Sequence, residues 1–363
     1  MTLTAGVVRA MGSIRPFAPD DIPAVVALRR KAFQHSAHPT AEALSDYLEE
    51  VFFRNPWRDA ALGSLVYVDA QGRIVGFLGV VPRQATFQGQ PIRVAVGTQL
   101  MVDRDARGLA GFELMKAFLS GPQDLAFSDV ANDLSRRMWE ALGGGPSLLQ
   151  SLHWTQPLRR GRFYTGLLAQ RLRVRGLGWG LRPLSWAVDA LAGGWASAHG
   201  LEEVPLTPTL MAAHLPELLG HVKLRPRYDE RSLRWLLDHL ATTGRRGELH
   251  RVAVRSADGA LAGWYAYFDN ADGVGQVVQV AARRDRSGDV LHCLFHHAWR
   301  QRLVALAGRV EPGLLSALGA SGALLSRDGP WVLVQSRRPE VLAAVHRGDA
   351  FLSRLDGEWW MSF

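Results

Sequence analysis

Apolar and polar residues alternate in two stretches of the chain, and a short polar turn interrupts each alternation. Residues 65–81 read LVYVDAQGRIVGFLGVV, and residues 251–268 read RVAVRSADGALAGWYAYF. An alternation with a period of two residues indicates a β-strand, and a glycine-containing turn between two such runs indicates a β-hairpin. The turn glycines are Gly72 in the first hairpin and Gly259 in the second.

Three further patterns recur in the same order in the two halves of the chain. Each half has another strand pattern, then a loop rich in Arg, Asp and Gly that leads into an amphipathic helix, and later a helix that ends in glycine. The matching positions are 97–103 with 275–281, Gly108 with Gly288, and 138–143 with 314–319. Matching positions are separated by a similar length of chain in every case, hairpins included, which predicts two copies of one α/β unit.

The two copies set the expected domain boundaries. We expect an N-terminal extension over residues 1–12, a first domain over 13–157, a connector over 158–205 and a second domain over 206–363. Helical sequence precedes each hairpin, so each predicted sheet should be flanked by helices.

The connector is rich in arginine and tryptophan. Its basic residues before the first acid, Asp189, are Arg159, Arg160, Arg162, Arg171, Arg173, Arg175 and Arg182, and its tryptophans are Trp179, Trp186 and Trp195. A basic amphipathic segment of this kind can lie on an anionic membrane surface. We favour the alternative that its apolar face packs between the two domains, because several glycines interrupt it.

Composition narrows the class of protein. The 363 residues are 47% apolar and 21% charged, which is typical of a globular chain. The single cysteine, Cys293, excludes an internal disulfide and a cysteine-rich zinc site, and we expect a cytoplasmic protein without a membrane-spanning helix. Although the net charge is +8, only three of the 42 basic residues are lysine. We attribute that ratio to a GC-rich genome and expect no nucleic-acid partner.

A candidate anion site follows the strand pattern of the first copy. Residues 99–111 run from a strand through a loop with two glycines and several arginines into a helix. Unpaired amides and the helix dipole at such a helix start can hold a phosphate, and glycine lets it approach the backbone. The loop is neither GxGxxG nor a Walker A motif, which disfavours a dinucleotide fold and a P-loop NTPase. An ordinary turn with solvated arginines remains the alternative.

Residues 13–155 resemble an acyltransferase domain of the GNAT superfamily, and residues 206–363 resemble it more weakly through the repeat. The segments that carry the resemblance are 14–25, 65–81, 99–102, 107–111 and 132–143. The resemblance implies two tandem GNAT-like domains, each a mixed, mostly antiparallel sheet flanked by helices. It also implies acetyl-CoA or another acyl-CoA as co-substrate and no metal.

The same resemblance implies roles for individual residues. Backbone groups near Leu100 and Val102 would hold the pantetheine and the acyl carbonyl, and Asn132 would lie beside the pantetheine. The amides expected to face the pyrophosphate are those of Arg107, Gly108, Ala110 and Gly111. In the reaction of this family, an amine or hydroxyl attacks the thioester while a base takes its proton and an acid protonates the leaving thiolate.

The sequence departs from the family pattern at informative positions. Asp105 stands where Gln or Arg is expected, and Trp139 stands where many members have the acid tyrosine. An indole cannot protonate a thiolate, so that role is lost or moved. The loop of the second copy, residues 281–289, keeps one glycine and adds Asp289, which would repel phosphate. We therefore expect the second domain to bind no CoA.

Two other sets of side chains are candidates for chemistry. Asp129 ends a predicted strand beside the expected thioester and is a candidate base, although a capping or turn aspartate is the favoured interpretation. His292 and His296 have the spacing of a metal pair on a helix, but no third ligand frames them, so we expect no metal.

We expect the first domain to transfer an acetyl or other acyl group from acyl-CoA to an amine or hydroxyl. The acceptor would be a small molecule, a sugar or a peptide. One alternative keeps the fold without the chemistry, as a catalytically silent binding or scaffold protein. Another is a peripheral membrane protein, held by the connector, in envelope polysaccharide biosynthesis.

Overall fold

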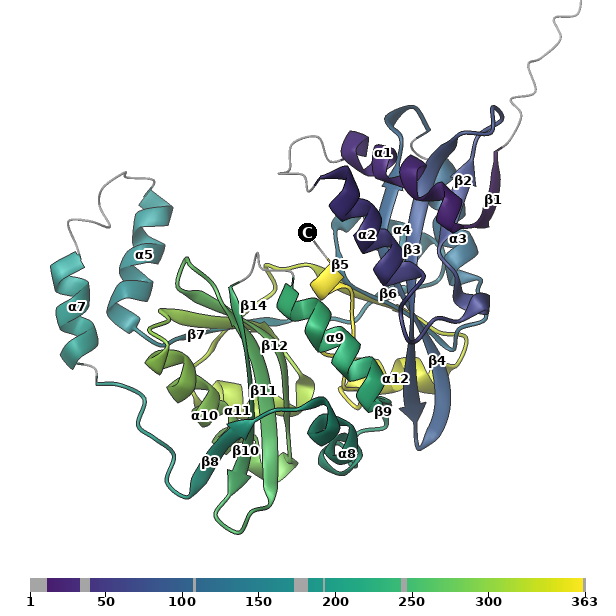
Figure 1. Ribbon diagram of the computed structural model, residues 1–363. Helices are drawn as coiled ribbons and strands as arrows, with labels where there is room; N and C mark the ends of the chain where they lie inside the picture. Colours follow the sequence, from purple (N-terminus) through teal and green to yellow (C-terminus); the bar gives the residue numbers. More distant parts are fainter. Residues whose placement is uncertain are drawn as a thin grey trace, which may run out of the picture.

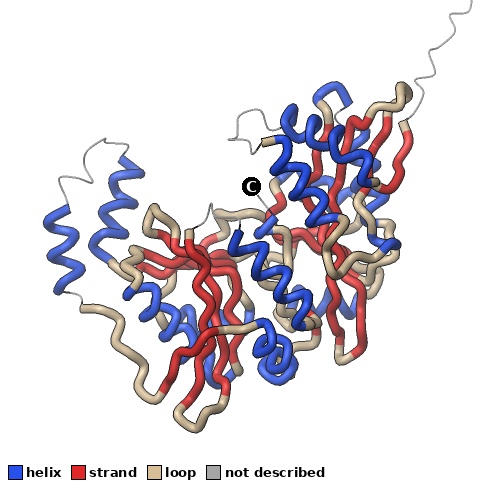
Figure 2. The backbone as a smooth tube through the Cα atoms, in the orientation of Figure 1, coloured by secondary structure: helices blue, strands red, loops and turns tan. Residues whose placement is uncertain are grey.

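Two β-sheets lie side by side in the computed structural model, each flanked by helices (Figures 1 and 2). The structure describes residues 12–32, 40–106, 109–172, 182–191, 193–242 and 247–361. The predicted fold class, two mixed sheets with flanking helices, is confirmed.

The first sheet has the strand order β1-β2-β3-β4-β5-β15-β6, and β9 pairs with the last residues of β3. Its strands are β1 (Ser13–Pro16), β2 (Leu65–Val68), β3 (Ile74–Phe87), β4 (Gln90–Val102), β5 (Leu125–Ala131), β6 (Gly145–Pro146), β9 (Leu224–Pro226) and β15 (Trp331–Gln335). Neighbouring strands are antiparallel except β4 and β5. Helices α1 (Ile22–Ala32) and α2 (Ala41–Phe52) cover one face, and α3 (Leu109–Leu119) and α4 (Asp133–Ala141) cover the other.

The second sheet has the strand order β14-β7-β13-β12-β11-β10-β8. Its strands are β7 (His153–Pro157), β8 (Leu201–Pro205), β10 (Glu248–Ser256), β11 (Leu261–Asp269), β12 (Val274–Ala282), β13 (Ala305–Arg309) and β14 (Leu324–Ser326). Helices α8 (Pro208–Leu218) and α9 (Glu230–Thr242) pack on one face, and α10 (Ser287–Arg300) and α11 (Leu315–Ala320) pack on the other. Helix α12 (Pro339–Arg347) follows β15. Short 3₁₀ helices are η1 (Pro19–Asp21), η2 (Ala60–Leu62), η3 (Arg104–Ala106), η4 (Arg284–Arg286), η5 (Pro312–Leu314) and η6 (Trp359–Met361).

The two sheets share one repeat, which is clearest at their centres. Val94 pairs with Leu125 in parallel register in the first sheet, and Val274 pairs with Ala305 in the same way in the second. The 3₁₀ helices η3 and η4 follow these strands with the same separation along the chain. The repeat seen in the sequence is therefore a repeat of the three-dimensional structure.

The turn glycines of the two hairpins adopt the same conformation. Gly72 between β2 and β3 has φ +78°, and Gly259 between β10 and β11 has φ +82°. This left-handed region is strained for a residue with a Cβ, which explains why both turns place glycine there.

The last strand of each repeat joins the sheet of the other. Strand β7 pairs with β13 and β14 in the second sheet, and β15 pairs with β5 and β6 in the first. This exchange carries the C-terminal residues back across the molecule to the first sheet (Figure 1). The predicted division at residue 157 did not include the exchange, so the proposed domains are interlocked through their strands.

The core runs through both halves. The largest cluster of buried apolar side chains contains Val25 and Leu44 from the first half and Leu236 and Trp264 from the second. Across the boundary, the Trp235 indole of α9 donates to the Glu50 carboxylate of α2. Burial of a shared apolar surface therefore holds the two sheets together.

The connector forms a helix pair, α5 (Arg160–Leu172) and α7 (Arg182–Leu191), that projects beside the second sheet (Figure 1). Arg162 Nε lies 2.9 Å from Asp189 Oδ2 and joins the two helices. The expectation that the apolar face of the connector packs between the domains is wrong for this pair, because seven of its large apolar side chains are exposed. Arg173, Arg175 and Trp179 lie outside the described residues.

A search of the described residues found no helix that combines the length and the apolar character needed to cross a membrane.

Candidate active site

Strands β4 and β5 pair only over three residues and then separate. Their parallel pairing covers Val94 to Val96 on β4, and β4 carries an extra residue opposite β3 near Gln99. Gln99 has φ +51°, a conformation that is uncommon for a residue with a side chain. Such a bulge bends a strand and ends regular pairing. The separation opens the parallel edge at the carboxyl end of β4.

A cavity of about 150 Å³ lies between the separated strands. Its lining includes backbone and side chains of β4, β5, α3 and α4, among them Gly97, Leu100, Ser128, Asn132, Phe118 and Trp139. Gly97 permits the close approach of Phe118, since a Cβ there would lie 3.0 Å from the ring. The apolar floor and polar walls suit a chain that carries both methylene and amide groups.

The predicted CoA-binding residues gather at this end of the sheet. Val102 ends β4, and Ala110 and Gly111 lie in the first turn of α3. A Cβ on Gly111 would lie 3.4 Å from Val102 Cγ2, so glycine keeps the start of α3 close to β4. Arg107 and Gly108 lie outside the described residues.

Asn132 lies on the rim of the cavity as the N-cap of α4. Its Oδ1 accepts a hydrogen bond of 2.9 Å from the backbone N–H of Ser135. Leu100 and Asn132 line the cavity, and Val102, Ala110 and Gly111 lie at the same edge of the sheet.

The corresponding edge of the second sheet lacks these features. Val94 and Val274 are equivalent positions of the repeat, and the same spacing along the chain makes Leu291 the equivalent of Gly111. Leu291 is buried, and Asp289 lies in the first turn of α10. The Asp289 carboxylate lies 3.0 Å from Arg286. A buried leucine and a carboxylate at the helix start both oppose phosphate binding.

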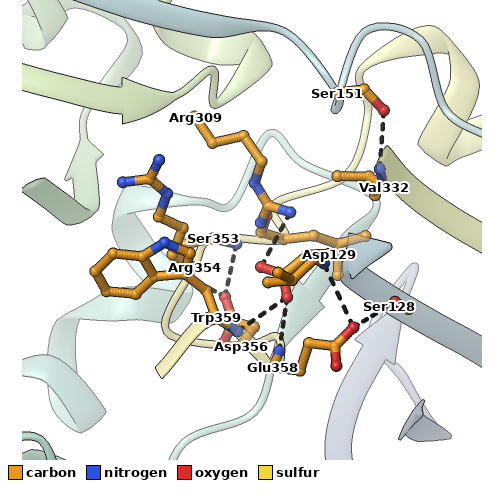
Figure 3. Close-up of polar contacts among 12 residues, drawn as sticks. Ser128, Asp129, Ser151, Arg309, Val332, Ser353, Arg354, Asp356, Glu358 and Trp359 are labelled. Atoms are coloured by element: carbon orange, nitrogen blue, oxygen red, sulfur yellow. Dashed lines mark hydrogen bonds and ion pairs between the residues drawn. The ribbon is translucent and has the colours of Figure 1, made fainter. Parts of the chain in front are cut away.

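Asp129 lies in a closed ion pair (Figure 3). Its Oδ2 is 3.2 Å from Arg309 Nη1, and its Oδ1 accepts from the backbone N–H groups of Glu358 (2.6 Å) and Trp359 (3.1 Å). Burial raises the pKa of the Asp129 carboxyl, and the Arg309 charge opposes that rise. The side chain is fully enclosed, and Gly357 approaches so closely that a Cβ would collide with it. These contacts enclose the Asp129 carboxylate and hold the C-terminal segment against β5.

Glu358 is the acidic side chain that reaches the cavity. It lines the cavity beside β4 and β5, and its carboxylate accepts from the hydroxyl of Ser128 and from the backbone N–H of Val130 at 3.4 Å (Figure 3). Burial, together with the Asp129 charge, raises the pKa of the Glu358 carboxyl to about 7. A carboxyl with this pKa can accept a proton near neutral pH.

Sequence reasoning missed Glu358 because it lies far along the chain from Ser128, near the opposite end. No local pattern in the segment DGEWW marks its glutamate as a site residue. Only the return of the C-terminal chain over the first sheet brings Glu358 to the cavity.

Trp139 is buried at the base of the cavity. It packs edge to face on Phe118 and is 1% exposed. The cavity lining that the structure describes contains no tyrosine. Trp139 therefore shapes the floor of the site, as expected of an indole that cannot serve as an acid.

One of the two histidines with the spacing of a metal pair, His292, bonds a backbone carbonyl. His292 Nε2 is 2.7 Å from the carbonyl of Ala196. Elsewhere on the second sheet, Glu248, His250 and Asp269 place ligand atoms within 4.8 Å of one another. His250 and Asp269 bond each other at 3.0 Å, which accounts for their proximity.

Comparisons with known proteins agree with this geometry. The family model described as an acetyltransferase (GNAT) domain matches residues 13–121. No curated protein matches the sequence.

Solved structures of similar fold cover 90% of this chain. They include a probable N-acyltransferase from Enterococcus faecalis (TM-score 0.59, 11% identity, 72% of that chain covered). A GCN5-related N-acetyltransferase from Anabaena variabilis has a TM-score of 0.59 at 12% identity, with 73% of it covered. Another from Kribbella flavida has a TM-score of 0.55 at 14% identity, with 72% covered.

Proposed function

We propose that the protein transfers an acyl group from acyl-CoA to an amine or hydroxyl, on the premise that residues 13–121 match the family model of a GNAT acetyltransferase domain. The observation that carries the proposal is the cavity between β4 and β5, which opens beside the glycine-bearing start of α3. A thioester in that cavity and a pyrophosphate at the helix start would lie at the two ends of the pantetheine arm of one bound CoA.

The proposed CoA site uses the residues gathered at this edge. Backbone groups of Leu100 and Val102 bind the pantetheine and the acyl carbonyl, and Asn132 lies beside the pantetheine. Amides of Ala110 and Gly111 face the pyrophosphate, and Arg107 and Gly108, which lie outside the described residues, keep the pyrophosphate role expected from the sequence. The dipole of the 11-residue helix α3 adds partial positive charge there.

Glu358 is the proposed general base. The acceptor nitrogen or oxygen attacks the thioester carbon, the new C–N or C–O bond forms, and the C–S bond breaks. The proton of the acceptor passes to the Glu358 carboxylate, and the CoA thiolate leaves and takes up a proton. The Ser128 hydroxyl holds the Glu358 carboxylate in place. Because the pKa of the Glu358 carboxyl is about 7, a fraction of the molecules has it deprotonated at neutral pH.

Calorimetric titration with acetyl-CoA tests the site. Gly111→Asp places bulk and negative charge at the start of α3 and should abolish binding. The matched control, Gly288→Asp, changes the start of α10, where a Cβ meets nothing within 4 Å, and should leave binding unchanged. Equal loss in both variants would contradict the assignment of CoA to the first half. Absence of binding by the unmodified protein would instead favour the catalytically silent alternative.

A second candidate function is attachment to an anionic membrane through α5 and α7. Of the twelve exposed large apolar side chains in the described residues, seven lie on this helix pair. They are Tyr164, Leu168, Leu172, Leu184, Trp186, Val188 and Leu191. Arginines accompany them in the sequence, and this combination is typical of helices that lie in a membrane interface.

A further inference from the structure

Arg83 is a buried cation whose terminal nitrogens, Nη1 and Nη2, have no hydrogen-bond partner among the described residues. It lies in the middle of β3 and is 8% exposed. Its Nε lies 3.4 Å from the carbonyl oxygen of Asp356. A buried charge without a hydrogen-bonded counter-ion is costly, so such a group usually meets an ionic partner.

Two tryptophans fix the orientation of this guanidinium. Its Cζ lies 3.9 Å from the ring centre of Trp57 and 5.3 Å from that of Trp360. Stacking occupies the faces of a planar guanidinium and leaves its N–H groups to bond in the plane. The two terminal nitrogens form the edge that binds two oxygens of one carboxylate or phosphate.

The acids nearest to Arg83 are engaged elsewhere. The Asp356 carboxylate accepts from the hydroxyl of Tyr228 and from the backbone N–H (2.8 Å) and hydroxyl (2.6 Å) of Ser353. Asp129 is paired with Arg309. Burial lowers the pKa of the Arg83 guanidinium to about 10, which leaves it charged at neutral pH.

Arg83 lines a groove that is rich in positive charge. The groove has a volume of about 580 Å³ and is lined by four arginines, Arg58, Arg83, Arg93 and Arg227, and by two aspartates, Asp59 and Asp124.

Both aspartates of the groove already accept hydrogen bonds. Asp59 accepts from the backbone N–H of Ala61, and Asp124 accepts from that of Arg93, both at 2.9 Å. Asp124 also lies 3.7 Å from Arg338. The groove is therefore electropositive, and one of its lining residues, Arg83, has buried terminal nitrogens without a hydrogen-bond partner among the described residues.

The groove and the proposed acyl site are both lined by residues of β3 and β4. Arg83 pairs with Val94 on β4, three residues before Gly97 at the start of the cavity, a distance of roughly 10 Å along a strand. Asp356, which contacts Arg83 Nε, is two residues from the proposed base Glu358. A molecule anchored at Arg83 could thus extend toward the thioester.

We propose that Arg83 binds an oxyanion of the acceptor, a carboxylate or a phosphate, so that the acceptor is an anionic amine or alcohol. The role of the bound anion as part of the acceptor rests on the proposed acyl transfer. The binding of the anion rests on the geometry of the groove alone. The anion binds in the plane of the guanidinium, between the rings of Trp57 and Trp360 and beside the exposed Arg227.

Anion titration without any CoA tests the binding. Inorganic phosphate and succinate are added separately to the full-length protein while tryptophan fluorescence is recorded, since Trp57 and Trp360 flank the proposed site. We expect a saturable change that is weakened at least tenfold in Arg83→Met. Arg83→Lys should retain charge but lose two-point binding, with an intermediate affinity. A response to succinate alone or to phosphate alone identifies which oxyanion the site prefers.

Two further variants control for charge and folding. Arg73→Met removes an exposed arginine from the β2–β3 turn and should titrate like the unmodified protein. Arg227→Met removes an exposed arginine of the groove and should weaken binding severalfold without disturbing the core. If Arg83→Met does not fold, the titration of Arg227→Met tests the proposed anion binding in its place. Curves for Arg227→Met and Arg83→Met that match those of Arg73→Met, or no saturable response to either anion, would overturn the proposal.

Acceptor kinetics with acetyl-CoA test the role. Matched amines with a free or an amidated carboxylate should differ in KM at least tenfold, and Arg83→Met should remove the difference while kcat changes little. A carboxylate preference that survives in Arg83→Met would overturn the assignment of this residue. Anion binding without any acyl transfer would leave the site intact and refute the proposed function alone.

Discussion

Asp129 and Arg309 occupy equivalent positions in the two repeats and form a buried ion pair with each other. Asp129 follows Leu125 on β5 by the same interval as Arg309 follows Ala305 on β13, and the two side chains are 0% and 3% exposed. The contact joins the two sheets where the repeats face each other (Figure 3). The carboxylate also accepts from the amides of Glu358 and Trp359, so one pair fixes both the arrangement of the sheets and the C-terminal segment.

Breaking this pair should be strongly destabilising. Asp129→Asn leaves Arg309 as an unpaired buried charge, and we expect a loss of about 3–5 kcal/mol in the free energy of unfolding. Denaturant unfolding measures the change. The control is Asp349→Asn, which removes the exposed partner of Lys223 and should cost less than about 1 kcal/mol. Similar small losses in both variants would contradict the structural role of Asp129.

The proposed base predicts a pH profile. Since Glu358 must be deprotonated to accept a proton, kcat/KM should fall as the pH drops below about 7. Glu358→Gln should lower the rate by roughly 10²- to 10⁴-fold and remove this limb of the profile, while acetyl-CoA affinity is retained. A limb near pH 7 that persists in Glu358→Gln would show that another group is the base.

The same carboxyl predicts a pH dependence of stability. Burial raises its pKa from the ordinary value of 4.5 to about 7, so the folded protein binds more protons than the unfolded chain between these values. This contribution is fully present below pH 4.5 and is lost as the pH rises through 7. Between about pH 5 and pH 8, stability should therefore fall less in Glu358→Gln than in the unmodified protein when both are measured by denaturant unfolding. An identical fall in both would refute the raised pKa.

The strand exchange predicts that the first domain does not fold alone. A fragment of residues 12–157 lacks β15 and leaves one edge of β5 unpaired, together with the apolar surface that the C-terminal segment covers. Circular dichroism should show no cooperative unfolding, and addition of a peptide of residues 327–361 should restore it. Cooperative unfolding of the isolated fragment would contradict the interlocked arrangement.

The helix pair of the connector predicts binding to acidic lipid. Flotation with phosphatidylserine vesicles should recover the protein, and Arg160→Glu with Arg171→Glu should reduce recovery at least tenfold, since each basic residue contributes about 1 kcal/mol near the surface. Arg54→Glu with Arg73→Glu makes the same charge change elsewhere. Equal recovery of both double variants, or no binding by the unmodified protein, would refute membrane attachment.

The sequence by itself determined the features that depend on local pattern. Period-two alternation and turn glycines located both hairpins, because a strand exposes alternate faces and a tight turn needs a left-handed residue. The similar order of signals revealed the repeat, and the loop before α3 pointed to the edge of the sheet where Gly111 and Val102 meet.

Tertiary structure alone decided which distant residues share a site. Glu358 reaches the cavity and Arg83 lies between Trp57 and Trp360 because β15 crosses to the first sheet and brings the following chain with it. For the same reason Asp129, a candidate base in the sequence, forms an ion pair with Arg309 and is fully buried. Strand pairing over such separations depends on the burial of shared apolar surface in the whole fold, and no local run of residues encodes it.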